Sequence, residues 1–298
     1  MKPNHRSLGP DFLLLAAIWG TSFMFMRLGT LGFGPVSSAG LRISVAALAL
    51  LPLLRRADDW RLIRAHALPL TVVGVLNTTI PFSLYSYALL HISTGLTAIL
   101  NASIPLFGAL VAWLWLKERP GRWRTVGLGL GFLGISLLSW RKVSLGGSDT
   151  LWAVLACLCA TLCYGIAASC TRIYLRGVPA LSTAGGSLLG AALVSALPTL
   201  LAWPDHAPGL SAWGAVIALG VLCTALAYVV FFRLIALAGA GKALTVTFMA
   251  PLFALLYASL LLGESITPWM VICGGIILLG VALATEYLRP GNWLARHA

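Results

Sequence analysis

Two prolines interrupt long apolar stretches of this 298-residue chain, and small polar side chains lie just before each of them. Asn101 and Ser103 precede Pro105, and Thr247 precedes Pro251. A proline removes a backbone hydrogen bond and kinks a helix. In an apolar medium the freed carbonyl must find a partner or line a wet cavity. We therefore interpret both prolines as hinge residues in the walls of a cavity, and packing kinks alone are the alternative.

Further polar and aromatic side chains lie at a similar depth in their apolar stretches and could bind one small organic solute. Aromatic rings offer stacking surfaces, and amide and hydroxyl groups offer hydrogen bonds to a carboxylate. The predicted substrate-binding residues are Trp19, Asn77, Thr78, Phe82, Tyr85, Asn101, Ser103, Tyr164, Tyr228, Thr247 and Phe248. Each aromatic side chain taken alone could instead pack in the interior or face lipid.

Two basic residues could contact the charge of such a solute. Arg42 lies inside an apolar stretch, where it either snorkels toward the surface as an anchor or faces the cavity. Lys242 begins another stretch and has the same two interpretations. A Schiff-base lysine for a chromophore is disfavoured, because no acidic residue lies near the middle of an apolar stretch to act as its counter-ion.

The eight acidic residues lie at the ends of the apolar stretches or between them. This placement argues against a relay of carboxylates that carries protons or sodium ions through the membrane. Gradient-driven passage and coupled transport both stay open. Glu118 and Glu264 each follow an apolar stretch, and each is either a gate or proton site, or an anchor that pairs with Arg or Lys at the surface.

The composition defines a membrane protein. Hydrophobic residues make up 59% of the chain and charged residues 9%, with a mean hydropathy of +0.94, whereas soluble domains carry about 25% charged residues. The net charge of +12 comes from short clusters between apolar stretches, which fits contact with anionic lipids rather than nucleic acid. We expect a lipid bilayer and a small-molecule substrate as partners, and no nucleic acid or obligate protein partner.

The six cysteines also lie within apolar stretches, as small packing residues do. A disulfide framework would need cysteines in loops of an oxidising compartment. No histidine lies in those stretches to complete a metal site. We therefore expect neither a cofactor nor a metal.

A membrane-spanning helix needs about 20 mostly apolar residues, and the chain divides into ten such stretches. We predict an all-α polytopic membrane protein, because the stretches lack the alternation of β-barrel strands. The predicted spans are 11–33, 36–54, 66–90, 93–116, 122–140, 149–172, 180–202, 211–236, 240–262 and 268–287.

The second half of the chain repeats the first. Residues 105–137 and 251–283 align without a gap at an offset of 146, with thirteen of 33 positions identical, including Pro, Glu, Trp and two Gly. We expect a single membrane domain, 1–298, built from five-helix repeats at 1–144 and 145–298. An odd number of spans per repeat inverts the second repeat in the membrane, an arrangement typical of secondary transporters that enclose a central cavity.

Lys and Arg predict the orientation. With ten spans, sixteen of these residues fall on the side of both termini and three on the other side. The positive-inside rule then places both termini in the cytoplasm.

Several short motifs extend this argument to a family. They are Trp19-Gly20-Thr21-Ser22-Phe23, Arg42, Ser103-Ile104-Pro105-Leu106, Glu118 and Gly127 to Gly134 in the first half, and Ala250-Pro251-Leu252, Glu264 and Gly274 to Gly280 in the second. On these residues the whole chain resembles the EamA branch of the drug/metabolite transporter superfamily, and looks closest to bacterial YddG-type exporters of aromatic amino acids. The resemblance implies ten helices, cytoplasmic termini, a central cavity and export of small metabolites.

Together these features predict a secondary transporter in the bacterial inner membrane that exports amino acids, aromatic ones favoured, by alternating access. An exporter of other metabolites or drugs of the same family is one alternative. A channel is another. An enzyme embedded in the membrane is disfavoured, because the chain supplies no repeated acidic motif and no paired histidines.

Overall fold

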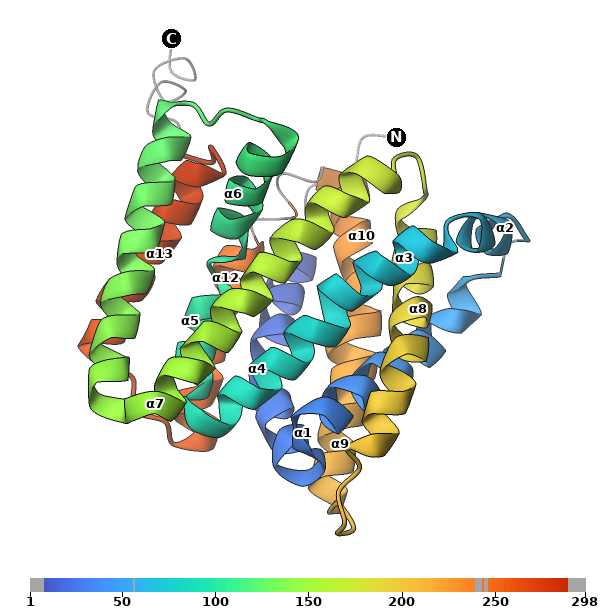
Figure 1. Cartoon of the computed structure of the whole chain (residues 1–298), viewed down its shortest axis with the longest axis horizontal. Helices are drawn as coiled ribbons and strands as arrows, with labels where there is room; N and C mark the ends of the chain where they lie inside the picture. The colour runs from blue at the N-terminus through green and yellow to red at the C-terminus, as the bar shows by residue number, and fades with distance from the viewer. Residues whose placement is uncertain (1–7, 56, 239–242, 244–245, 289–298) are drawn as a thin grey trace.

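A computed structural model describes residues 8–55, 57–238, 243 and 246–288, and these residues form helices and connecting loops without a strand. Figure 1 shows long helices lying side by side in one bundle. The all-α membrane fold predicted from the sequence is confirmed.

The first half of the chain contains seven α-helical segments, one short 3₁₀ turn and one short π-helical turn. They are α1 (Leu8–Leu50), the 3₁₀ turn η2 (Leu51–Leu53), α2 (Ala57–Ala65), α3 (Ala67–Gly74), the π-helical turn η3 (Val75–Thr79), α4 (Ile80–His91), α5 (Thr94–Asn101), α6 (Ile104–Leu116) and the first limb of α7 (Arg122–Tyr174). The short helix α2 lies in what the sequence predicted to be a charged connection.

The second half begins within α7 and continues through α8 (Ala180–Leu201), α9 (Leu210–Gly220), the π-helical turn η4 (Val221–Leu226), α10 (Ala227–Ala238), α12 (Val246–Leu262) and α13 (Pro268–Ala284). By length and composition, six helical segments of the described chain could cross a membrane, and α12 and α13 are shorter apolar helices. The number of ten spanning helices therefore stays a prediction.

Two glycines reverse the chain inside α1 and α7. Gly34 has a φ of 77° and Gly147 a φ of 72°, a backbone conformation that a side chain with a Cβ rarely adopts. Figure 1 shows α7 folding back on itself at its lower end. Each of these long helices thus contains two of the predicted spans, which meet at the glycine.

Several predicted spans are not continuous α-helices. The span at 66–90 contains η3, and the span at 211–236 contains η4. The span at 93–116 breaks at Ala102 and Ser103, so that Pro105 lies in the first turn of α6, where its missing N–H leaves no hydrogen bond unmade. Pro251, its counterpart in the repeat, lies inside α12 instead.

Contacts between the halves are reciprocal, which identifies an approximate two-fold relation. A Cβ added at Gly20 of α1 would lie 3.0 Å from the backbone N of Ala254 in α12. A Cβ added at Gly165 of α7 would lie 3.0 Å from the backbone N of Gly108 in α6. Two surfaces that exchange partners in this way are related by an approximate two-fold axis, as inverted repeats are.

The first limb of α7 packs against α13 through glycines, and Figure 1 shows these two helices side by side. A Cβ at Gly134 would lie 3.1 Å from the backbone N of Ile277, and a Cβ at Gly280 would lie 2.6 Å from the Cα of Gly131. Small residues allow such close approach between membrane helices. This contact forms one side of the bundle and leaves the centre to the other helices.

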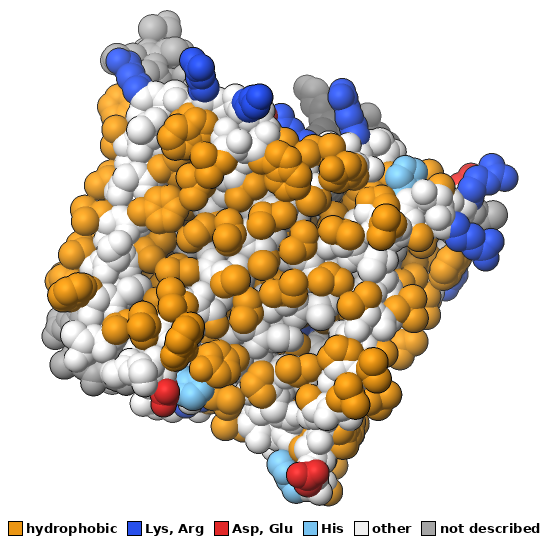
Figure 2. Space-filling model, viewed as in Figure 1, with side chains coloured by type: hydrophobic (Ala, Val, Ile, Leu, Met, Phe, Trp, Pro, Cys, Tyr) orange, Lys and Arg blue, Asp and Glu red, His pale blue; other side chains and the backbone are white. Residues whose placement is uncertain are grey.

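Figure 2 shows hydrophobic side chains covering the middle of the visible face, with Lys and Arg gathered along its upper edge. Large exposed hydrophobic side chains of the described residues include Trp140, Leu193, Leu197, Leu201 and Leu210. A surface of this kind is solvated by lipid rather than water. The structure thus agrees with the composition in defining a multi-pass membrane protein.

Candidate functional site

A cavity of about 1920 Å³ lies between the two halves. Its wall runs from Phe23 and Ala102 near the middle of the bundle to Gly9, Val178 and Tyr287 at one end. We call that end, where α1 begins and α13 ends, the terminus face, and the other end the distal face. Because no lining residue of the described chain comes from the distal loops, the cavity opens at the terminus face and is closed at the distal face.

Most residues predicted to bind substrate lie on the cavity wall. Those on the wall are Trp19, Asn77, Phe82, Tyr85, Asn101, Tyr164, Tyr228, Thr247 and Phe248, together with Pro105 and Arg42. They come from α1, η3, α4, α5, α6, α7, α10 and α12. Residues far apart in the sequence thus meet at one cavity, while their part in binding stays a prediction.

Three predicted residues lie away from the wall. Thr78 is buried and donates its hydroxyl hydrogen to the backbone O of Gly74, at 2.6 Å. Ser103 is also buried and donates to the backbone O of Leu100, at 2.6 Å. Pro251 is buried inside α12. Both hydroxyl groups are thus bonded to nearby backbone carbonyls. Lys242 lies outside the described residues.

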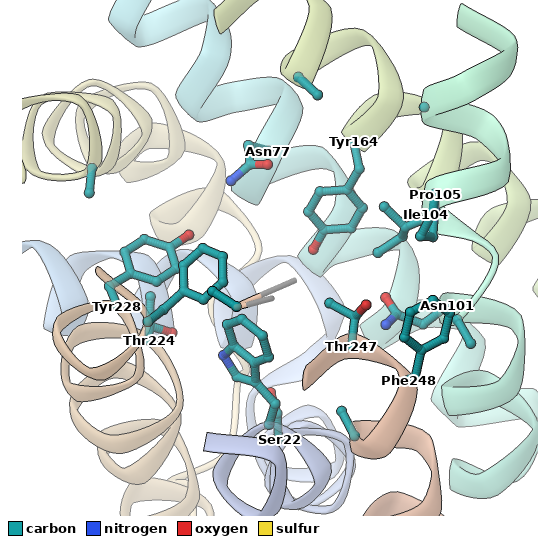
Figure 3. A pocket seen from close by; sticks show the side chains of 18 of the residues that line it. Ser22, Asn77, Asn101, Ile104, Pro105, Tyr164, Thr224, Tyr228, Thr247 and Phe248 are labelled. Atoms are coloured by element: carbon teal, nitrogen blue, oxygen red, sulfur yellow. The ribbon is translucent and has the colours of Figure 1, made fainter. Parts of the chain in front are cut away.

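The polar side chains of the wall point into the cavity from several directions. In Figure 3 the amide of Asn77 and the hydroxyl of Tyr228 point toward one another, and Tyr164 points toward Thr247. Asn101 and Thr247, which are equivalent in the repeat, face the same space. The hydroxyl of Tyr85 is buried and has no hydrogen-bond partner among the described residues. A solute in the cavity would therefore meet several hydrogen-bonding groups.

Aromatic rings supply most of the remaining wall. The rings of Tyr85 and Tyr164 are stacked, with centroids 6.4 Å apart, and Trp19 lies against Phe231 at 5.4 Å. Phe23 meets Tyr85 edge-on at 6.1 Å. Ring surfaces of this kind accept apolar and aromatic groups.

Arg42 is the cation of the described cavity wall. Its side chain is only 5% exposed, its Nε donates to the Thr224 hydroxyl at 3.1 Å, and its guanidinium lies 3.7 Å from the centroid of the Phe82 ring. The alternative in which Arg42 snorkels toward the surface is therefore wrong for this structure, because the side chain points inward and is buried.

The sequence analysis missed Thr224, Phe231, Ser22 and Cys223, which also line the cavity. The repeat offset of 146 contained the signal for two of them, because it relates Thr78 to Thr224 and Tyr85 to Phe231. Within the described ranges, no group of three His, Cys, Asp or Glu side chains could hold a metal ion.

The inverted repeat and the cavity open at one face define the class: a multi-pass membrane transporter. The chain belongs to the EamA-like transporter family of the drug/metabolite transporter superfamily, whose family model matches residues 11–140 and again 151–285. The two matches agree with the repeat found in the sequence, and the boundary at 144/145 stays a prediction.

Curated relatives span nearly the whole chain. The uncharacterized transporter YoaV of Bacillus subtilis is 23% identical, over 90% of this chain and 93% of its own length. The uncharacterized inner membrane transporter YedA of Escherichia coli is 27% identical, over 96% and 95%. The probable terminal-alkyne amino-acid exporter of Streptantibioticus cattleyicolor is 25% identical, over 91% of each chain.

A solved crystal structure shares the fold, with a TM-score of 0.65 at 21% identity over 95% of this chain and 97% of the other. The family and these relatives are described as transporters and not as enzymes. The finer likeness to YddG-type exporters stays a prediction.

Proposed function

We propose that this transporter exports amino acids, aromatic ones favoured, across the bacterial inner membrane by alternating access. The observation that carries the proposal is the cavity, which opens at one face and presents aromatic rings beside a few amide and hydroxyl groups. An amino acid with a large apolar side chain matches a site of this composition.

Two comparisons support the proposal. One relative that covers 91% of this chain is named a probable amino-acid exporter, and another is named an inner membrane transporter.

Lys and Arg gather at the upper edge of the molecule in Figure 2, which is the edge where α6 and the second limb of α7 end. Cationic loops favour the cytoplasmic side, so we place the terminus face and both termini in the cytoplasm.

In the proposed mechanism, this conformation is the state open to the cytoplasm. Rocking of one repeat against the other about the approximate two-fold axis would close the terminus face and open the distal face around the same site. Pro105, beside the break between α5 and α6, is our candidate hinge on the cavity wall. Pro251 inside α12 is its counterpart in the second repeat.

The test is uptake of labelled phenylalanine and tryptophan into proteoliposomes that contain the purified protein, with and without a pH gradient. We expect saturable uptake that exceeds empty vesicles and that other aromatic amino acids inhibit. Uptake no faster than in empty vesicles would refute the substrate proposal, and uptake that rises in proportion to concentration without saturation would indicate a channel. Acceleration by the pH gradient would identify proton coupling.

The site itself is tested in the same assay. Asn101→Ala and Tyr85→Ala remove groups from the cavity wall and should lower transport by about tenfold each, the loss expected for one hydrogen bond or one ring contact. Trp140→Ala removes an exposed side chain away from the cavity and serves as the control. Unchanged rates for both cavity variants would refute the assignment of the site.

A further inference from the structure

Arg42 carries a positive charge that the described protein leaves without a counter-ion. The guanidinium is always protonated in proteins, and it is buried within the membrane-spanning bundle. Glu286 is the acidic residue of the described cavity wall, and it lies at the exposed terminus face. A buried charge without a partner is strongly unfavourable, so the cavity near Arg42 favours an anion.

The neighbours of Arg42 hold the guanidinium in place without neutralising it. The Thr224 hydroxyl accepts from Nε and itself donates to the backbone O of Leu219 at 2.9 Å, so its own proton is already used. The Phe82 ring covers one face of the guanidinium. One terminal nitrogen, Nη1, is buried and has no hydrogen-bond partner among the described residues.

We propose that the solute supplies the missing anion, and that Arg42 binds its carboxylate. The proposal rests on the export function above, because it takes the cavity as the solute site. A guanidinium is suited to carboxylate oxygens through paired N–H donors. The described wall offers one cation, which matches a single negative charge better than a doubly charged phosphate. The aromatic wall would receive the rest of the solute.

In this assignment Arg42 selects for the carboxylate of the solute, and Thr224 positions the guanidinium of Arg42. The experiment measures binding to the purified full-length protein, by competition or intrinsic fluorescence. It compares acid and amide pairs: phenylalanine with its amide, leucine with its amide, and 3-phenylpropionate with its amide. We expect the acids to bind at least about tenfold more tightly than the amides, as loss of a charge-assisted contact implies.

Variants then assign the preference to the side chain. Arg42→Gln should bring acids and amides to within about twofold of each other, Arg42→Lys should keep a reduced preference, and Thr224→Val should weaken it. Arg61→Gln, which changes an exposed arginine of α2, is the control. If Arg42→Lys keeps part of the preference for acids over amides, the loss of that preference in Arg42→Gln comes from the lost charge and not from misfolding.

The outcomes separate the two proposals. Amides that bind as well as acids, or a preference that survives in Arg42→Gln, would overturn the role of Arg42 while leaving amino-acid export intact. Binding of 3-phenylpropionate without binding of either amino acid would support Arg42 and contradict the export of amino acids. A panel in which no compound binds would contradict both.

A second, independent observation concerns two ion pairs that the repeat relates to each other. Arg27 of α1 contacts Glu264 at 3.1 Å, and Arg172 of α7 contacts Glu118 after α6. The offset of 146 relates Glu118 to Glu264, and an offset of 145 relates Arg27 to Arg172. Each pair therefore joins the two halves, one at each face of the membrane.

The same backbone geometry presents both carboxylates. Lys117 and Gly263 adopt left-handed conformations with φ of 56° and 65°. The N–H of Glu118 then bonds to the O of Ala112 at 3.3 Å, and the N–H of Glu264 to the O of Ala258 at 3.0 Å. In both cases a residue in the left-handed conformation ends the helix, and the N–H that follows it returns to a carbonyl of the last turns. The repeat thus builds two equivalent attachment points.

The surroundings of the two pairs differ. At the closed distal face, Glu264 is 14% exposed and also accepts from the backbone N–H groups of Thr94 and Gly95, at 2.9 and 3.1 Å, at the start of α5. At the open terminus face, Glu118 is 33% exposed and Arg172 64%. The more buried pair, with the additional hydrogen bonds, lies at the face that is closed.

We infer that these pairs act as two alternating latches. Arg27–Glu264 holds the distal face closed in this conformation, and Arg172–Glu118 becomes the buried latch when the terminus face closes. The ion pairs thereby bias which face is open, and their loss should shift the two faces in opposite directions.

The test uses a single cysteine at Thr247 on the cavity wall, in a chain whose six native cysteines are replaced. Its labelling by a membrane-impermeant maleimide is measured from each side, in vesicles of both orientations. Glu264→Gln should increase labelling from the distal face by about tenfold, since it removes a charge-assisted contact. Glu118→Gln should decrease labelling from that face. Asp205→Asn, in an exposed loop, is the control.

Opposite shifts would support the latches. Shifts in the same direction, or unchanged labelling in both variants, would show that the pairs only support the fold and would overturn the inference.

Discussion

The contact between α7 and α13 should tolerate no side chain at Gly280. A Cβ at this position would lie 2.6 Å from the Cα of Gly131 and 2.8 Å from the backbone O of Gly127. These neighbours are backbone atoms, which cannot move aside by rotating a side chain. Gly280→Ala therefore requires the two helices to separate.

The magnitude follows from two opposing effects. Overpacking costs about 1–3 kcal/mol, and Gly280→Ala belongs toward the upper end because the obstructing atoms are backbone. Alanine recovers up to about 1 kcal/mol through its higher helix propensity. We therefore expect a net destabilisation of about 1–2 kcal/mol.

Gly275 of the same helix offers the matched control, because a Cβ there would meet nothing within 4 Å. Gly275→Ala should leave stability unchanged or raise it slightly. The assay is thermal unfolding in detergent with a thiol-reactive dye, which reports exposure of the five buried free cysteines. A midpoint for Gly280→Ala equal to or above that for Gly275→Ala would refute the close contact.

Three further predictions follow from single contacts. Ser103→Ala should leave transport unchanged in the proteoliposome assay, because the buried Ser103 hydroxyl already donates to the backbone O of Leu100; a loss as large as that of Asn101→Ala would contradict this placement. Ser182→Ala should destabilise the fold by about 1–3 kcal/mol, measured by thermal unfolding, because Ser182 donates at 2.7 Å to the buried Asp59 carboxylate; no change in midpoint would refute the contact. The hydrogen bond from Arg172 lowers the pKa of Glu118 below the ordinary value for a glutamate. This carboxylate therefore stays ionised wherever an ordinary glutamate is ionised, and it is protonated only at a lower pH. Glu118→Gln should therefore change transport by the same factor at about pH 6 and pH 8, and a factor that differs between them would identify Glu118 as a titrating group.

Much of the fold could be predicted because each signal came from local sequence. Glycines with positive φ reverse the chain at Gly34 and Gly147, between predicted spans, and Glu118 and Glu264 follow helices that end alike. The interruption of helices was missed. Val75–Thr79 and Val221–Leu226 are π-helical, and an inserted turn of this kind leaves hydropathy unchanged while it rotates the following face of the helix.

That rotation explains why the residues predicted to bind substrate do not all lie on the cavity wall. A regular helical period cannot tell which hydroxyl faces the cavity once the register has shifted. Thr78 donates to Gly74 in the preceding turn, whereas Ser103 lies at a break between helices. Their positions in apolar stretches resembled those of Asn77 and Asn101, which do line the cavity.

The sequence by itself determined the membrane class and the duplication, because these depend on composition and on an internal match, and it predicted the inversion from an expected odd number of spans per repeat. Only the tertiary structure decided how equivalent positions differ. Thr78 and Thr224 are related by the repeat, yet only Thr224 meets an arginine, because Arg42 has Leu188 as its counterpart at the offset of 146. A buried charge and its partners lie on different helices, and packing alone brings them together.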